Sequence, residues 1–200
     1  MFDLIEQNLA KIDFESISND RQTELSILIN YIQLKKDANL PINLNFICTH
    51  NSRRSQFSQL WAKIASQFFN INANCYSGGV EVTAFNERAV KSLENFGLKI
   101  DIEGTKNPKY TLQWSESDTP LVQFSKLYDD PSNPSSDFAA IMTCSHADEN
   151  CPFIHGADER VPIRYDDPKT YDNTPLEKEM YDRRSFEIAS EMMYVFSEIK

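Results

Sequence analysis

The stretch Ile42-Asn-Leu-Asn-Phe-Ile-Cys-Thr-His-Asn-Ser-Arg-Arg-Ser-Gln56 decides the fold, because it joins a buried strand to a helix through a short polar loop. Over residues 42–48, apolar and polar side chains alternate before three apolar residues in succession, a pattern typical of a buried strand. Apolar residues then recur at helical spacing over residues 56–69, which predicts a helix. The strand ends at Cys48, and we expect the helix to begin at Arg54.

Strands and helices continue to alternate after this loop. The pattern predicts strands at 72–77, 121–124 and 138–143, and helices at 86–96 and 176–199. Gly78 and Gly79 close the first of these strands, and Gly97 caps the first of these helices. Residues 105–134 have the least regular pattern and are interpreted as an excursion within the domain. The alternation indicates an α/β fold, a three-layer sandwich in which helices cover both faces of a central parallel sheet.

The N-terminal residues have a different pattern. Helical periodicity over residues 1–38, with a capping signal at Asn19 and Asp20, predicts two helices before the first strand. We therefore divide the chain into an N-terminal helical extension, residues 1–40, packed on a main domain, residues 41–200.

Composition excludes several classes of function. The 20 Lys and Arg residues against 30 Asp and Glu give a net charge of -10, and no concentrated basic patch is present, so we expect no nucleic-acid partner. No apolar run reaches the roughly 18 residues that span a bilayer, so we expect no membrane partner either. The start at Met1 does not have a basic and then apolar leader, which favours the cytoplasm. Four cysteines in such a chain favour thiol chemistry, a metal site or core packing over a secreted disulfide framework.

The loop after the first strand has the composition of an oxyanion site. Cys48 ends the strand and Arg54 follows six positions later, where the helix begins. Successive backbone amides and the helix N-terminus can form a cradle for a tetrahedral anion, and they favour the thiolate form of Cys48. The expected oxyanion-binding residues are Thr49, His50, Asn51, Ser52, Arg53, Arg54 and Ser55. The alternative interpretation is a buried strand-end cysteine beside two solvated arginines.

A second group of reactive residues lies near the C-terminus. Cys144 and Cys151 are seven residues apart on a polar segment that we expect to be irregular, and they can form a disulfide if the segment bends. Asp167 precedes Pro168 and is a candidate acid over the loop, although it is also explained as a turn aspartate. A competing interpretation of this region is a zinc site formed by Cys144, His146, Cys151 and His155.

The sequence resembles the low-molecular-weight protein tyrosine phosphatase superfamily and, within it, the thioredoxin-coupled arsenate reductases. The resemblance covers the chain from about Asn43 to the C-terminus. It rests on Phe46-Ile-Cys-Thr-His-Asn-Ser-Arg-Arg-Ser-Gln56, Tyr76-Ser-Gly-Gly-Val-Glu81, Asn86-Glu-Arg-Ala-Val90, Thr143-Cys-Ser-His-Ala-Asp-Glu-Asn-Cys-Pro152 and Tyr165-Asp-Asp-Pro168. The two downstream cysteines distinguish the reductases from ordinary phosphatases.

The resemblance implies a role for each candidate residue. Cys48 is the nucleophile that attacks arsenate, Arg54 holds the oxyanion, and Asp167 protonates the departing oxygen. Cys144 then attacks the Cys48 adduct and releases arsenite, after which Cys151 attacks Cys144 and presents the disulfide to thioredoxin. Thiols supply the electrons, so no flavin, nicotinamide or metal is expected. The alternatives are a phosphatase that hydrolyses phosphotyrosine or small aryl phosphates, and a module that binds oxyanions or senses redox state without turnover.

Several positions depart from the family pattern. His50 stands where the family usually has glycine, which predicts a narrower loop. Arg53 stands where another cysteine is common, which adds a cation near the site. Gln59 replaces a glutamate found near a monovalent cation in some relatives, so no such ion is expected. The N-terminal extension and the longer path from Cys48 to Cys144 also lie outside the pattern.

Overall fold

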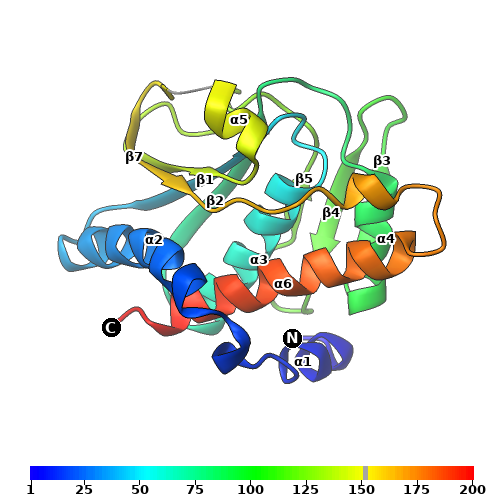
Figure 1. Cartoon of the computed structure of the whole chain (residues 1–200), viewed down its shortest axis with the longest axis horizontal. Coiled ribbons are helices and arrows are strands. Elements are labelled where there is room, and N and C mark those ends of the chain that lie inside the picture. The colour runs from blue at the N-terminus through cyan, green and yellow to red at the C-terminus, as the bar shows by residue number, and fades with distance from the viewer. Residues whose placement is uncertain (151–152) are drawn as a thin grey trace.

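A four-stranded parallel sheet in the order β2-β1-β6-β7 forms the centre of the computed structural model, which describes residues 1–150 and 153–200 (Figure 1). Its strands are β1, Ile42–Cys48; β2, Ala73–Gly79; β6, Phe138–Met142; and β7, Ala157–Pro162. Cys48 pairs with Gly79 at the carboxyl end of β1, and Ile47 pairs with Met142. The register therefore brings the loops after three strands to one edge of the sheet, the usual place for a site in an open α/β fold.

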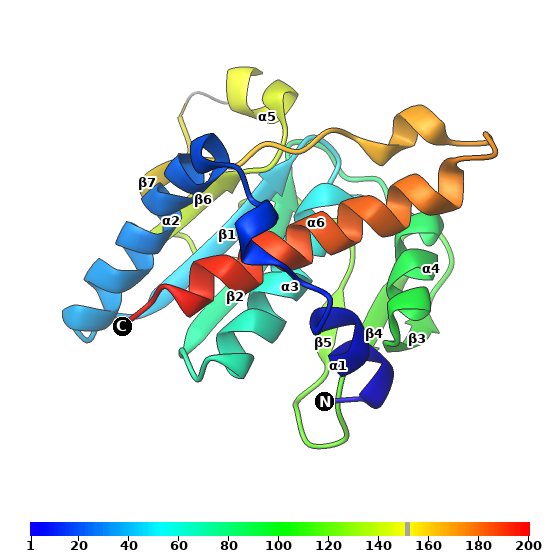
Figure 2. The ribbon, with the colours of Figure 1, turned by 60° about the horizontal axis from the view of Figure 1, so that its bottom comes forward.

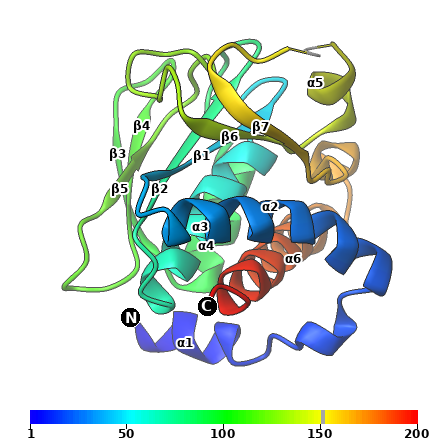
Figure 3. The same cartoon turned by 90° about the vertical axis from the view of Figure 1, so that its left-hand side faces the viewer.

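Helices cover both faces of this sheet, as the sequence predicts, but unequally (Figure 3). The helices are α1, Asp3–Leu9; η1, Phe14–Ser16; α2, Asn19–Asp37; α3, Arg54–Phe68; α4, Glu87–Phe96; α5, Ser145–Asn150; η2, Pro168–Tyr171; and α6, Glu177–Ser197. Leu44 and Phe46 belong to the larger core, which α2, α3, α4 and α6 complete. Ala140 and Met142 alternate onto the opposite face, where the short helix α5 packs.

The excursion is more regular than its sequence pattern indicates. Residues 99–123 contain a separate antiparallel sheet, formed by β3, Lys99–Glu103; β4, Lys109–Gln113; and β5, Leu121–Gln123. Only the last of these strands was expected. Tyr110 and Leu112 of β4 are buried on one face, whereas β3 is half or fully exposed along its whole length. A strand with so little buried surface has a weak apolar signal.

Two further elements correct the sequence interpretation. The segment that follows Cys144 is the helix α5, where an irregular segment was expected, and β7 was not expected at all. Strand β7 begins with exposed charged residues and buries Val161 fully, so its apolar pattern is short. Within residues 1–150 and 153–200, no helix combines the length and apolar character needed to cross a bilayer.

The N-terminal extension crosses α6, with α1 and α2 on opposite sides of that helix (Figure 2). Its main polar attachment is Arg21, which donates to both carboxylate oxygens of Glu191 at 2.7 and 2.9 Å. The hydroxyl of Tyr165 donates to the same carboxylate at 2.6 Å, and the Arg21 guanidinium lies 4.9 Å from the centre of the Tyr165 ring. Burial and the adjacent Glu191 carboxylate raise the pKa of Tyr165, so this phenol stays neutral.

We expect replacement of Glu191 by alanine to lower the free energy of unfolding by about 3 to 5 kcal/mol, because it removes the carboxylate that accepts from the Tyr165 hydroxyl and from two nitrogens of the largely buried Arg21 guanidinium. Glu24, which pairs with the same arginine but is 54% exposed, is the matched control. The E24A variant should lose less than about 1 kcal/mol. Urea unfolding measures both, and equal losses would contradict a buried attachment at Glu191.

Candidate active site

The loop between β1 and α3 is fixed by hydrogen bonds that its backbone carbonyl groups accept from neighbouring residues. All five carbonyls of residues 48–52 accept hydrogen bonds of 2.9 to 3.3 Å. The donors, in chain order, are the N–H of Val80, the N–H of Glu81, the Ser125 hydroxyl, the Gln56 amide and the N–H of Asn86. In a trans peptide, the carbonyl of one residue and the N–H of the next point in opposite directions. The amides of residues 49–53 are therefore directed toward the concave side, as an oxyanion cradle requires.

Asn51 fixes the turn of the loop. Its backbone is left-handed, with φ of 46°, a conformation that asparagine tolerates better than most residues. Its side-chain oxygen accepts from the N–H of Lys126 at 3.0 Å, and its amide donates to the Ser55 hydroxyl at 2.9 Å. Because Ser55 accepts from Asn51, its own proton is available for the Cys48 sulfur, 3.1 Å away. A hydroxyl that donates to this sulfur stabilises a thiolate.

Gly79 lets the second strand approach this loop closely. A Cβ atom at Gly79 would lie 2.8 Å from the backbone nitrogen of Asn51 and 2.8 Å from the carbonyl oxygen of Thr49. Both contacts are shorter than real Cβ contacts, and both involve backbone that cannot rotate away. In the sequence, the Gly78-Gly79 pair marks the end of a strand and belongs to a motif shared with the family, whereas its close approach to the loop is seen in the structure.

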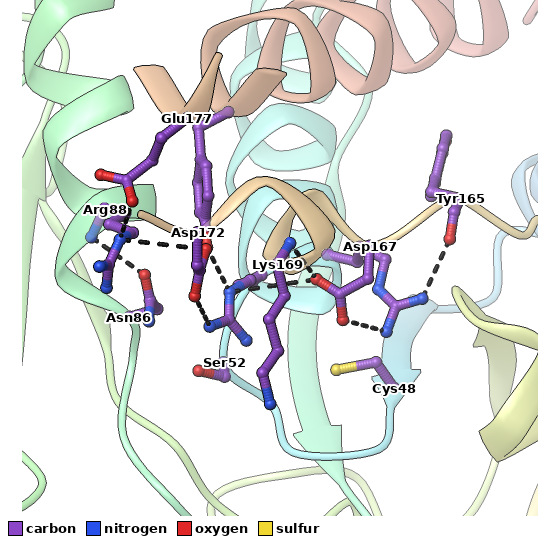
Figure 4. A network of polar contacts seen from close by, with 12 residues as sticks. Cys48, Ser52, Asn86, Arg88, Tyr165, Asp167, Lys169, Asp172 and Glu177 are labelled. Carbon is purple, nitrogen blue, oxygen red and sulfur yellow. Dashed lines mark hydrogen bonds and ion pairs between the residues drawn. The ribbon is translucent and has the colours of Figure 1, made fainter. Parts of the chain in front are cut away.

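Arg54 and Asp167 face each other at the mouth of the loop. The Arg54 guanidinium donates to the Asp167 carboxylate at 2.7 Å and to the carbonyl of Tyr165 at 3.0 Å. Its Nε is buried and has no hydrogen-bond partner among the described residues, so this donor is left for an anion. Figure 4 shows the Cys48 sulfur facing the Asp167 carboxylate, whose other oxygen accepts from the N–H of Lys169 at 3.0 Å. The structure thus brings Cys48, Arg54 and Asp167 together.

Arg53 is bonded to a neighbouring polar network and is not free in the cradle. Its Nε donates to the Tyr181 hydroxyl at 2.7 Å, and a terminal nitrogen lies 3.5 Å from the Asp172 carboxylate. Arg88 extends the network, with its Nε 2.7 Å from Glu177. The charge of Arg53 is therefore matched by Asp172. Sequence reasoning missed Asp172 and Tyr181, because neither is near the loop in sequence.

Two other departures from the family pattern have structural explanations. His50 does not fill the cradle, because its side chain is 42% exposed and its Nε2 lies 3.2 Å from Glu81. The amide of Gln59 is part of a buried neutral network: its oxygen accepts from the Ser77 hydroxyl at 2.6 Å and from the Gln123 amide at 3.0 Å. Gln123 also donates to the carbonyl of Gln56, so the antiparallel sheet reaches the base of the loop.

Cys144 lies beside the loop in a second buried cluster that also contains Cys48. Its thiol is 1% exposed and lies 3.5 Å from the Thr49 hydroxyl. The helix α5 that follows is attached through the buried Asp148, whose carboxylate is paired with Arg160 and Arg164. The structure therefore places four of the five predicted catalytic residues around one loop, and the fifth, Cys151, lies outside the described residues.

The zinc interpretation finds no support in the described part of the chain. There, no three His, Cys, Asp or Glu side chains gather as ligands for one metal ion. Cys144 is buried against the loop, whereas His155 is exposed and packs against Phe153. The remaining cysteine, Cys75, is a free thiol in the main core, where burial raises its pKa to about 12.

A cavity of about 450 Å³ opens beside the loop. His50, Ser52 and Arg53 line one part of it, and Phe85, Tyr110 and Lys169 line another. This volume exceeds what a tetrahedral oxyanion needs, and the two aromatic rings lie 5.3 Å apart in an edge-to-face arrangement. The cavity therefore has room for an organic group attached to the anion.

Comparison with known proteins gives consistent results. No family model matches the chain. An arsenate reductase from Halalkalibacterium halodurans is 29% identical over 154 residues, which cover 76% of this chain and 93% of the relative. An arsenate reductase from Bacillus cereus is 32% identical over 123 residues, 62% of this chain and 74% of the relative. Among solved structures, the low-molecular-weight protein tyrosine phosphatase of T. tengcongensis aligns over 79% of this chain and 99% of its own length, with a TM-score of 0.53 and 15% identity.

Replacing Gly79 by alanine should reduce turnover about a hundredfold, because the added Cβ displaces the backbone of residues 49 and 51. Gly104 is the control, since a Cβ there meets nothing closer than 3.7 Å. The G104A variant carries the strain of a positive φ but should keep full activity. Steady-state kinetics of both variants test this, and an active G79A enzyme would show that the close approach is unimportant.

Cys75 should resist alkylation in the folded protein. At pH 8, about four units below its pKa of about 12, roughly one Cys75 thiol in ten thousand is ionised, and the side chain is buried as well. We expect iodoacetamide at pH 8 to modify Cys48 first and to reach Cys75 only after the addition of denaturant. Peptide mass spectrometry at timed intervals measures this order, and early modification of Cys75 would contradict it.

Proposed function

Since this chain belongs to the arsenate reductase family built on the low-molecular-weight protein tyrosine phosphatase fold, we propose that it reduces arsenate to arsenite by a cysteine cascade. The observation that carries this proposal is the position of Cys144, a second thiol buried beside the loop that holds Cys48. A phosphatase requires one thiol at this place, whereas a thiol-based reductase requires two, because reduction of arsenic from As(V) to As(III) takes two electrons.

The first step uses the loop. Arsenate occupies the cradle, where the amides of residues 49–53 and the Nε of Arg54 donate to its oxygens. The Cys48 thiolate, stabilised by Ser55, attacks arsenic, and a hydroxyl group of arsenate receives a proton from Asp167 and leaves as water. The product is a covalent adduct in which Cys48 sulfur is bonded to As(V).

The second step transfers the electrons. The Cys144 thiolate attacks the sulfur of Cys48, and the bond between that sulfur and arsenic breaks. The bonding pair remains on arsenic, which leaves as arsenite, while the two thiols become a Cys48–Cys144 disulfide. The burial of both sulfurs in one cluster supports this exchange, because it keeps water from hydrolysing the adduct first.

The cycle is completed by Cys151 and an external thiol. We assign to Cys151 the attack on Cys144 that carries the disulfide to the surface, and to thioredoxin its reduction. We place this reaction in the cytoplasm, where thiols are kept reduced. This chemistry needs no resident metal or organic cofactor.

A second candidate function is hydrolysis of phosphotyrosine or a small aryl phosphate. It uses Cys48, Arg54 and Asp167 alone, with water in the place of Cys144. The cavity beside the loop favours it, because its volume of about 450 Å³ can hold an aryl group whose phosphate lies in the cradle. The two activities are distinguished by the second thiol.

We expect the purified protein, with thioredoxin, thioredoxin reductase and NADPH, to oxidise NADPH in an arsenate-dependent manner. The C144S variant should fall to background with arsenate, because the As(V) adduct cannot be resolved, yet should still hydrolyse p-nitrophenyl phosphate. The matched control is C75S, which replaces a cysteine of the main core and should keep arsenate turnover within about twofold. Wild-type protein that hydrolyses the phosphate ester but never consumes NADPH with arsenate would reverse the order of the two candidates.

A further inference from the structure

The Thr49 hydroxyl connects the buried second thiol to a histidine at the surface. Its oxygen lies 3.5 Å from the Cys144 sulfur and 3.3 Å from Nδ1 of His146. Thr49 and Cys144 are 9% and 1% exposed, whereas His146 is exposed on α5. The three groups thus form a path from the interior of the site to solvent.

The chemistry of these groups sets the direction in which a proton can move along this path, from Cys144 to His146. A hydroxyl has one proton to donate and two lone pairs that accept, so Thr49 can accept from the Cys144 thiol while donating to Nδ1 of His146. Imidazole is the side chain whose ordinary charge change lies near neutral pH, which suits it to take up a proton. The backbone N–H of Ala147 lies 3.4 Å from the same sulfur and stabilises the negative charge that remains on it.

Two carboxylates of this region, Asp148 and Asp167, are already paired with arginines. Asp148, two residues after His146, is buried and paired with Arg160 and Arg164. Asp167 is paired with Arg54 at the other side of the loop. Neither carboxylate bonds the Thr49 hydroxyl or the Cys144 thiol, whereas His146 contacts the Thr49 hydroxyl directly.

We propose that His146 accepts the proton of Cys144 through the Thr49 hydroxyl when Cys144 attacks the Cys48 sulfur. This inference rests on the proposed reductase function and concerns its second step only. The thiol proton passes to Thr49 as the Thr49 proton passes to Nδ1, and the sulfur that remains forms the disulfide. The electron pair of the sulfur–arsenic bond stays on arsenic, and imidazolium later releases its proton to water. His146 acts through Thr49 and does not touch the arsenic.

The test isolates the second step. In a C151S background, a single arsenate turnover stops at the Cys48–Cys144 disulfide, which acid quenching and mass spectrometry follow over time. We expect H146Q to slow formation of this disulfide at least about tenfold, because glutamine can bond Thr49 but cannot take a proton. H155Q, a change at another exposed histidine in the same region, should form the disulfide at the unaltered rate. Affinity for inorganic phosphate, measured by calorimetry, should be the same in all three proteins.

Two readouts separate proton transfer from a structural role. Imidazole added to H146A should restore the rate several-fold but should have no effect on H155Q. The T49V variant should form the disulfide as slowly as H146Q, and the T49V/H146Q double variant should be no slower than either single variant. The T49S variant keeps the hydroxyl and should keep the rate of disulfide formation. An unaltered rate in H146Q would overturn the proposal. So would a slow H146A variant whose rate does not respond to imidazole.

A measurement without arsenate distinguishes failure of this proton relay, from Cys144 through Thr49 to His146, from failure of the proposed reductase function. In a C48S/C151S background, the rate at which iodoacetamide alkylates Cys144 at neutral pH reports how readily this thiol loses its proton. H146Q should lower this rate and H155Q should not. If H146Q has this effect but the wild type does not reduce arsenate, the relay stands and the reductase assignment fails. If the wild type reduces arsenate and H146Q alters neither rate, the relay fails alone.

Discussion

A cradle of backbone amides forms only where the carbonyls of the same peptide units are held away from it, since the two groups point in opposite directions across each peptide plane. In this chain, the five carbonyls of residues 48–52 are held by donors from the segment after β2, from α3 and from the segment after β5. The left-handed turn at Asn51 and the glycine at position 79 follow from the same requirement. The positions of Cys48 and Arg54, at the two ends of the loop, depend on this outer shell of bonds.

The antiparallel sheet has a direct part in that shell. The Ser125 hydroxyl and the N–H of Lys126 both bond the loop, and Gln123 bonds Gln56 and Gln59 beneath it. This insertion therefore supports the loop between β1 and α3. The buried amides of Gln56, Gln59 and Gln123 hold the base of the loop with neutral groups, which avoids the cost of desolvating an ion there.

The sequence predicts the parts of this molecule that rest on local patterns. Apolar periodicity locates β1, α3 and α6, and the spacing of Cys48 and Arg54 identifies the loop. Strand β3 buries so little surface that its sequence has no clear apolar pattern. Helix α5 is short and polar, and among its described residues only Ala147 places an apolar side chain in the core. The attachment of Arg53 to Tyr181 joins residues 128 positions apart, and such a contact leaves no trace in spacing.

Tyr165 links the N-terminal extension to the chemistry at the loop. Its carbonyl accepts from Arg54, and its hydroxyl donates to Glu191, which Arg21 of α2 also binds. These two bonds hold the backbone and the side chain of Tyr165, so they fix the position of the segment that leads to Asp167 relative to the loop. A displacement of α2 would free Glu191 to move and, through Tyr165, would shift the guanidinium that meets the anion. The extension thus supports the segment that carries Asp167, as the antiparallel sheet supports the loop itself.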